Sequence, residues 1–211
     1  VAVSDVNDIQ VRYAARGGLG AVMGSKGIKA IVVDDGDAVL HRVFDEALLR
    51  EASKTLAQAI LEDPKTENRH KLGTPAILMV ANELGLLPTR NFSAGRFEKA
   101  EEIAGERVAE VIAARGGEGR SGTPCLRGCV ISCSNIFPDP SGKKTVASFQ
   151  YENIALLGPN CGIGDLDDIA ELNHLCNEVG VDAIETGAAI GVAMEAGVIP
   201  FGDAGGAKDL I

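Results

Sequence analysis

The sequence DLDDIAELNHLCNEVGVDAIETGAAIGVAMEA, residues 165–196, predicts two consecutive helices. Asp165 is a good N-cap for the first helix, Asp168 at position N3 suits the helix dipole, and Gly180 lies just past its end. The second helix, Ala183 to Ala196, is rich in small residues, which favours close packing against its neighbours. These two helices indicate a chain whose core is mainly helical.

Segments upstream of residue 165 also predict helices. Good helix formers run from Asp45 to Glu62, and Thr74-Pro75 suits the N-cap and first position of a helix that ends at Gly85. Another helix is predicted from Phe97 to Ala114. The only strand that we predict is a short buried one, Lys29 to Val33. The expected fold class is therefore mainly α, with a short β remnant near the N-terminus.

Composition restricts the possible partners. The chain has 211 residues, a formal net charge of −10 and five cysteines. Nucleic acid and anionic membrane surfaces need a basic face, so neither is an expected partner. No apolar run is long enough to span a membrane, and the first residues do not resemble a signal peptide. An odd number of cysteines without a secretion signal favours reduced thiols or metal ligands, and hence a cytoplasmic location.

Three cysteines form the closest cluster of possible metal ligands. Cys125, Cys129 and Cys133 have the spacing C-x3-C-x3-C. This matches neither the C-x2-C pair of zinc sites nor the C-x2-C-x2-C run of ferredoxins, so zinc and an iron–sulfur cluster both stay open. Either centre usually needs a fourth ligand from elsewhere. The alternative is a set of inert buried thiols.

A glycine-rich loop at residues 16–27 precedes the predicted strand. It resembles a phosphate-binding loop but does not match one, because Gly20 lies too close to the next glycine and Gly27 replaces the hydroxyl residue. Arg16 beside Gly17 and Gly18 could still hold an anion through the guanidinium and backbone N–H groups. A tight turn before a strand is the alternative.

Glu171 and His174 form an E-x-x-H pair on the helix that follows Asp165. Residues at i and i+3 share a helix face and can share a metal ion. Both point away from the apolar stripe of the helix, so a metal here would face outward, toward another subunit or domain. The alternative is a solvated surface pair.

Glu152 precedes the apolar run Ile154 to Leu157. A partly buried carboxylate there would have a raised pKa and could transfer protons. Simple capping or ion pairing is the alternative.

Several segments together resemble the tungsten-containing aldehyde ferredoxin oxidoreductase family. The resemblance covers nearly the whole chain and keeps the family's order of motifs. It is carried by RGGLGAVMGSK (16–26), ELGLLPTRNF (83–92), the cysteine run, Tyr151-Glu152, LGPNCGI (157–163) and NEVGVD (177–182).

The resemblance implies an enzyme that oxidises aldehydes to carboxylic acids. The chemistry would take place at tungsten or molybdenum held by two pterins, a tungstopterin cofactor. Electrons would pass through a [4Fe–4S] cluster to ferredoxin. Arg16 and Gly17 would lie at the pterin phosphates, with the Gly17 carbonyl near a bridging magnesium ion. The implied cofactor-binding residues are Arg16, Gly17, Gly18, Gly20, Asn177, Gly180 and Asp182.

The resemblance also assigns the remaining candidates. Cys125, Cys129 and Cys133 would hold three irons of the cluster, with the fourth cysteine in a C-terminal domain. Glu152 would be a proton carrier near the tungsten. Glu171 and His174 would bind a metal on the axis of a homodimer.

Two departures from the family pattern bear on function. The usual cysteine spacing is C-x2-C-x3-C, and Asn177 replaces the usual first Asp of a pterin motif. The substrate could differ accordingly, since some relatives reduce aromatic thioesters.

The resemblance implies a fragment of a longer enzyme. Residues 1–36 would end the pterin-binding N-terminal domain, and residues 37–211 would form an incomplete helical middle domain. Alone, such a fragment should be inactive and bind little or no tungsten. The alternative is a non-catalytic iron–sulfur or zinc module for electron transfer or scaffolding.

Overall fold

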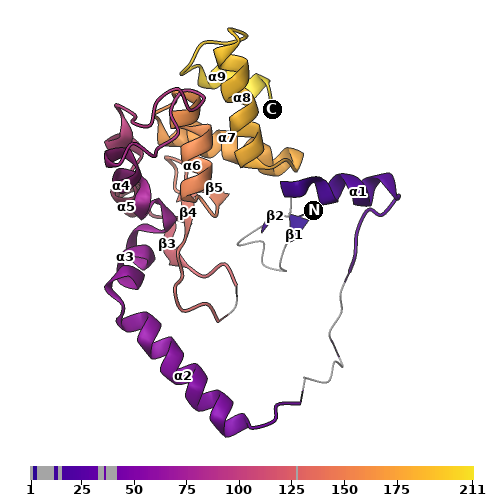
Figure 1. The fold of residues 1–211 in the computed structure, drawn as a ribbon, viewed down its shortest axis with the longest axis vertical. Coiled ribbons are helices and arrows are strands. Elements are labelled where there is room, and N and C mark those ends of the chain that lie inside the picture. Colours follow the sequence, from indigo (N-terminus) through magenta and orange to yellow (C-terminus); the bar gives the residue numbers. More distant parts are fainter. Residues whose placement is uncertain (1, 4–11, 14–15, 33–35, 37–41, 127) are drawn as a thin grey trace.

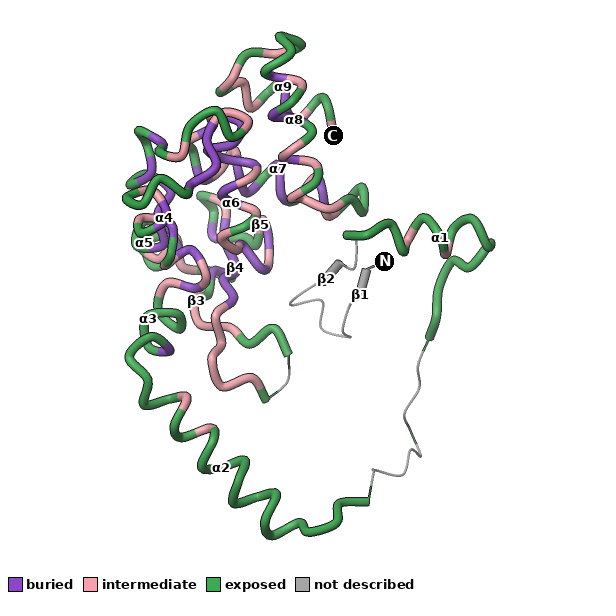
Figure 2. Tube along the Cα trace, in the orientation of Figure 1, coloured by how far each residue is buried: buried purple, intermediate pink, exposed green. Residues whose placement is uncertain are grey.

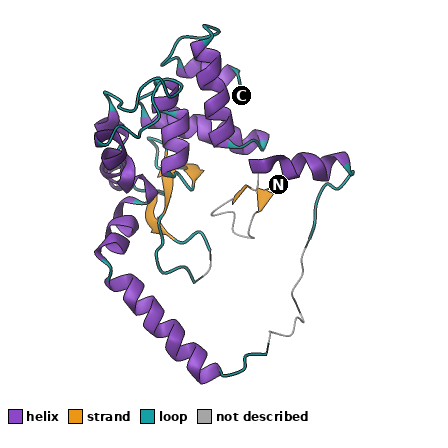
Figure 3. Cartoon of the chain, viewed as in Figure 1, coloured by secondary structure: helices purple, strands orange, loops and turns teal. Residues whose placement is uncertain are grey.

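The computed structural model describes residues 2–3, 12–13, 16–32, 36, 42–126 and 128–211 (Figure 1). Helices dominate these residues, as Figure 3 shows, so the mainly helical fold class is confirmed. The helices are α1 (Leu19–Ser25), α2 (Glu46–Glu62), α3 (Pro64–Leu72), α4 (Leu78–Glu83), α5 (Gly105–Arg115), α6 (Tyr151–Leu157), α7 (Leu166–Val179), α8 (Ala183–Glu195) and α9 (Ala204–Asp209). Short 3₁₀ turns are η1 (Arg16–Gly18), η2 (Thr74–Ile77), η3 (Ala100–Ile103) and η4 (Pro159–Cys161). No helix of the described residues has the length and apolarity needed to cross a membrane.

The buried core lies between α4 and α9 and includes a small sheet. Figure 2 shows burial concentrated there, whereas α1 and α2 are largely exposed along their length. Completely buried side chains come from several of these elements, which join them into one core: Leu78, Ile103, Phe137, Phe149, Ile154, Leu157, Ile169 and Leu172.

The sheet was not predicted from the sequence. Strands β3 (Arg120–Thr123), β4 (Ser134–Pro138) and β5 (Lys144–Ala147) pair antiparallel in that order. Every residue of β4 is buried, including the polar Ser134 and Asn135, so the strand lacks the alternation that marks a half-exposed strand. The loop between β3 and β4 carries the three clustered cysteines. A separate pair, β1 (Ala2–Val3) and β2 (Arg12–Tyr13), is antiparallel.

The predicted starts of two helices are confirmed. The Asp45 side chain accepts a hydrogen bond from the Leu48 backbone N–H at 2.9 Å and begins α2. Asp165 does the same for α7, and Gly180 ends that helix in the left-handed conformation with φ 81°.

The helix predicted after Thr74 differs in its first turn. Residues 74–77 form the 3₁₀ turn η2, and Thr74 does not cap it. Its hydroxyl instead accepts a hydrogen bond from the Tyr151 backbone N–H at 2.9 Å, which joins η2 to α6. Thr74 thus bonds a backbone group that is distant in sequence and does not cap its own helix.

The single helix predicted for residues 97–114 is wrong. It divides into η3 and α5 at Ala104, whose ψ of 162° is extended. A Cβ on Gly105 would lie 2.8 Å from the Ala76 backbone nitrogen, so the break lets two backbones pack closely.

The predicted buried strand at residues 29–33 is also not found. Residues 29–32 are exposed and pair with no described strand, and Val33 lies outside the described residues. An apolar run needs hydrogen-bonding neighbours to form a strand, and the described chain supplies none here.

Candidate cofactor site

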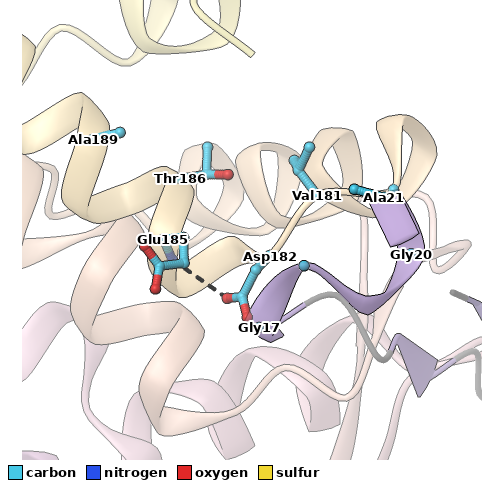
Figure 4. A pocket seen from close by; sticks show the side chains of 10 residues that line it. Gly17, Gly20, Ala21, Val181, Asp182, Glu185, Thr186 and Ala189 are labelled. Atoms are coloured by element: carbon cyan, nitrogen blue, oxygen red, sulfur yellow. Dashed lines mark hydrogen bonds between the residues drawn. The ribbon is translucent and has the colours of Figure 1, made fainter. Parts of the chain in front are cut away.

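A cavity of about 700 Å³ lies between the N-terminal glycine turn and the junction of α7 and α8 (Figure 4). This volume is in the range of small-molecule sites. One wall comes from η1 and α1, and the other from α8 and the turn before it. The lining residues are Gly17, Gly18, Gly20, Ala21, Gly180, Val181, Asp182, Glu185, Thr186 and Ala189.

The glycine wall depends on left-handed backbone. Gly17 and Gly18 have φ angles of 81° and 73°, which residues with a Cβ adopt only at a cost. No atom lies within 4 Å of a Cβ built on either residue, so their conformation, and not crowding, requires glycine. The open wall leaves space for a ligand to approach the backbone.

Asp182 organises the opposite wall. Its Oδ1 accepts hydrogen bonds from the backbone N–H groups of Ile184 at 2.7 Å and Glu185 at 3.4 Å, so it is the N-cap of α8. Its Oδ2 accepts a hydrogen bond from Nε of Arg16 at 2.8 Å. One carboxylate thus starts α8 and holds the glycine turn beside it.

Arg16 keeps donors for a ligand. It binds Asp182 through Nε, and its side chain is 65% exposed while that of Asp182 is 9% exposed. The two outer amino groups of a guanidinium are further donors and suit a phosphate or carboxylate. The pair therefore combines a structural contact with a possible anion-binding group.

The structure brings together candidates that are far apart in sequence. Gly17, Gly18 and Gly20 line the same cavity as Gly180 and Asp182, and Arg16 adjoins it through its ion pair. Asn177, on α7, is partly buried and is not among the described residues that line the cavity.

Sequence reasoning missed two polar lining residues. Glu185 and Thr186 lie on α8, three and four residues after Asp182. Helical spacing of i+3 and i+4 from a predicted N-cap would have found them.

The chemistry of these residues suits a pterin that carries a phosphate group. A guanidinium beside glycine backbone suits the phosphate, and the carboxylate and hydroxyl groups of α8 suit the N–H-rich edge of a pterin ring.

The three clustered cysteines lie on the loop between β3 and β4. Cys125 is exposed, and Cys129 and Cys133 are partly exposed, so the alternative of buried inert thiols is wrong for them. Within the described part of the chain, no group of three His, Cys, Asp or Glu side chains is arranged to hold a metal ion. The cluster assignment therefore stays a prediction.

The other two cysteines are core residues. Cys161 and Cys176 are fully buried, and burial raises the pKa of both thiols, that of Cys161 to about 12. The Cys161 thiol donates weakly to the carbonyl oxygens of Leu156 and Gly187. Neither thiol has the thiolate character of a reactive cysteine.

The predicted partial burial of Glu152 is wrong. It lies in the first turn of α6 and is exposed, because the helix turns Ile154, Ala155 and Leu157 toward the core. Burial and the nearby Glu152 carboxylate raise the pKa of Tyr151 instead. A role for Glu152 in proton transfer stays a prediction.

Glu171 and His174 are both exposed on α7, which confirms their predicted outward direction. Glu171 accepts a hydrogen bond from Lys208 of α9, which also donates to Asp168 at 3.0 Å. The bond to Glu171 is the main reason that the pKa of Lys208 is raised. Metal binding at this pair stays a prediction, and Lys208 forms an ion pair with Glu171 in the structure.

Comparison with known proteins finds matches over most of the chain. A family model described as aldehyde ferredoxin oxidoreductase, domains 2 and 3, matches residues 51–208. A second, the N-terminal domain of the same enzymes, matches residues 1–35.

Individual relatives agree with the family models. Tungsten-containing aldehyde ferredoxin oxidoreductases of Pyrococcus abyssi and Pyrococcus horikoshii are 39% and 38% identical over 202 residues, which is 94% of this chain and 32% of theirs. A Pyrococcus furiosus protein named aliphatic sulfonate oxidoreductase, WOR-like subunit, is 30% identical over 86% of this chain and 28% of its own length.

Proposed function

Because the chain belongs to the aldehyde ferredoxin oxidoreductase family, we propose that it forms part of an enzyme that oxidises aldehydes to carboxylic acids. The chain spans about a third of the length of the curated relatives it matches. The overall reaction adds water to the aldehyde carbon and releases two electrons and three protons with the carboxylate. When bound, a tungsten or molybdenum bispterin supplies the oxidising centre, and a [4Fe–4S] cluster passes electrons to ferredoxin.

One observation carries this proposal: the cavity that joins the glycine turn to the start of α8. Its two walls lie far apart in sequence, at residues 17–21 and 180–189, yet the ion pair of Arg16 and Asp182 holds them together. Both walls contain residues that the family resemblance assigns to the pterin. Two family motifs, one at the glycine turn and one at the start of α8, thus line the same cavity.

The residues of this cavity would bind and orient the pterin. The outer amino groups of Arg16 would bind a phosphate, and the backbone of Gly17 and Gly18 would approach it closely. The Gly17 carbonyl would face the magnesium ion. Glu185 and Thr186 would hydrogen-bond the edge of the ring.

The other candidates keep their proposed roles. Cys125, Cys129 and Cys133 would bind the cluster, supported by their accessibility on one loop. Glu152, exposed at the start of α6, would accept a proton. The pair of Glu171 and His174 would face a metal on a homodimer axis, supported by its outward direction.

We also propose a domain boundary at residue 36. The N-terminal family model ends at residue 35 and the second begins at residue 51, which supports this division. Residues 1–36 would then belong to the pterin-binding domain and residues 37–211 to the helical domain.

A chimera tests the proposed function. This chain would replace the matching segment of the Pyrococcus abyssi relative, and aldehyde-dependent reduction of a viologen dye and tungsten content would be measured anaerobically. We expect bound tungsten and dye reduction. In the same chimera, Arg16→Ala should lose tungsten, whereas Arg107→Ala, at an exposed position of α5, should not. A chimera that retains tungsten but oxidises no aldehyde would contradict the proposal.

A further inference from the structure

A left-handed turn holds Asn91 beside the back of α8. Arg90, Asn91 and Phe92 have φ angles of 45°, 53° and 59°, an unfavourable conformation for three consecutive residues with side chains. The turn is fixed by backbone hydrogen bonds from Arg90 N–H to the Pro159 carbonyl and from Asn91 N–H to the Asn160 carbonyl, each 2.9 Å. Such a conformation persists only where its surroundings impose it.

The Asn91 side chain reaches the end of α8. Its Nδ2 donates a hydrogen bond to the carboxylate of Glu195, the last residue of that helix. A carboxylate is unfavourable at a helix C-terminus because the dipole is negative there. The amide of Asn91 offsets this repulsion and ties the helix end to the turn.

The middle of the same helix face is also held. Asn160 donates through Nδ2 to the Gly187 carbonyl at 3.1 Å. A Cβ on Gly187 would lie 2.5 Å from the Leu156 carbonyl oxygen, and one on Gly191 would lie 2.6 Å from Asn160 Nδ2. These contacts confirm the close packing predicted for the small residues of this helix.

The held face is opposite the cavity wall. Gly187, Gly191 and Glu195 recur every four residues and share one side of α8. Thr186 and Ala189 lie on the other side and line the cavity. A shift of the helix away from the turn would therefore move these two residues into the cavity.

We propose that Asn91 is a positioning residue that sets the place of α8 beside the cavity, acting through its hydrogen bond to Glu195. The proposal rests on the proposed function for its consequence in cofactor binding. Asn suits both tasks, because it tolerates left-handed backbone better than most residues and its amide donates to a carboxylate.

The test exchanges the two partners. Asn91→Asp places two carboxylates beside each other. Asn91→Asp combined with Glu195→Gln restores the hydrogen bond with its direction reversed, since the amide at position 195 then donates to the carboxylate at position 91. Hydrogen exchange of the α8 amides is measured by NMR, together with the affinity of the chain for neopterin monophosphate. Asn68→Asp, at an exposed position of α3, is the charge-matched control.

We expect Asn91→Asp to speed amide hydrogen exchange at α8 and to weaken the binding of neopterin monophosphate about tenfold. The double variant should recover most of the lost protection and most of the lost affinity. Glu195→Ala, which leaves the left-handed turn unaltered, should speed exchange at α8 even if Asn91→Asp fails to fold. Unchanged exchange in Glu195→Ala, or no recovery in the double variant, overturns the inference. If the wild-type chain does not bind the probe, the proposed binding of a pterin phosphate at this cavity fails, and exchange alone decides the role of Asn91.

Discussion

Nε of Arg16 lies 2.8 Å from Oδ2 of Asp182, across 166 residues of sequence. Asp182 is also the N-cap of α8, so this contact connects the glycine turn to the start of the helix that forms the opposite cavity wall. Without it, the two halves of the proposed pterin site would have no charged contact within the part of the chain that the structure describes.

Replacing Asp182 should separate its two roles. Asp182→Ala removes the cap and should lower the free energy of unfolding by about 1 kcal/mol, whereas Asp182→Asn keeps a capping oxygen and should cost less than half of that. The exposed Arg16 partner adds little to either value. Urea unfolding followed by circular dichroism measures the free energy of unfolding of each variant. Equal decreases in Asp182→Ala and Asp182→Asn would contradict the capping role.

The buried thiol of Cys161 should make stability fall at high pH. Its pKa is raised from 9.0 to about 12, so the unfolded chain loses this proton first. The stabilising effect is complete below pH 9 and is lost between pH 9 and 12, at about 1.4 kcal/mol per pH unit. Urea unfolding from pH 8.5 to 10.5 should therefore show a steeper decline in the wild type than in Cys161→Ala. If the free energy of unfolding falls equally with pH in the two proteins, the burial of the Cys161 thiol does not cause the decline.

Thiol accessibility should divide the cysteines into two groups. At pH 8, iodoacetamide should modify Cys125, Cys129 and Cys133 in the folded chain and leave Cys161 and Cys176 unmodified until denaturant is added. If the loop binds an iron–sulfur cluster, anaerobic incubation with iron and sulfide should protect the first three. Mass spectrometry of peptides measures each site. Full labelling after reconstitution would oppose the cluster assignment.

Gly187 should not tolerate a side chain. Gly187→Ala would press its Cβ against the Leu156 carbonyl oxygen, at 2.5 Å, and should cost about 1–3 kcal/mol of stability. Gly24→Ala, in α1 with no atom within 4 Å of the new Cβ, should be neutral or slightly stabilising. Thermal unfolding compares the pair, and similar midpoints would argue against close packing of α8.

Local signals made part of this fold predictable. Asp45, Asp165 and Gly180 mark helix ends through hydrogen bonds and backbone angles that involve only nearby residues. The sheet of β3, β4 and β5 was missed because β4 is buried at every position and so lacks the alternation that marks a half-exposed strand. The break at Ala104 was missed because contact with the backbone near Ala76 causes it.

The candidate site shows the same division. Motif resemblance selected Arg16, the glycines and Asp182 from two distant segments, and the structure brings those segments to one cavity. The burial of Glu152 was misjudged because neighbouring apolar residues do not fix the rotation of a short helix. The orientation of Glu171 and His174 was predictable because α7 is long and its apolar stripe is regular.

NMR titration of the chain with neopterin monophosphate measures whether the cavity between the glycine turn and α8 binds a pterin phosphate. If a pterin phosphate binds in this cavity, the largest amide shifts are expected at Gly17, Gly18 and residues 180–186. The affinity is then expected to be about tenfold weaker in Arg16→Ala and unchanged in Arg107→Ala. Shifts centred elsewhere, or equal affinity in Arg16→Ala and the wild type, would contradict binding at this cavity.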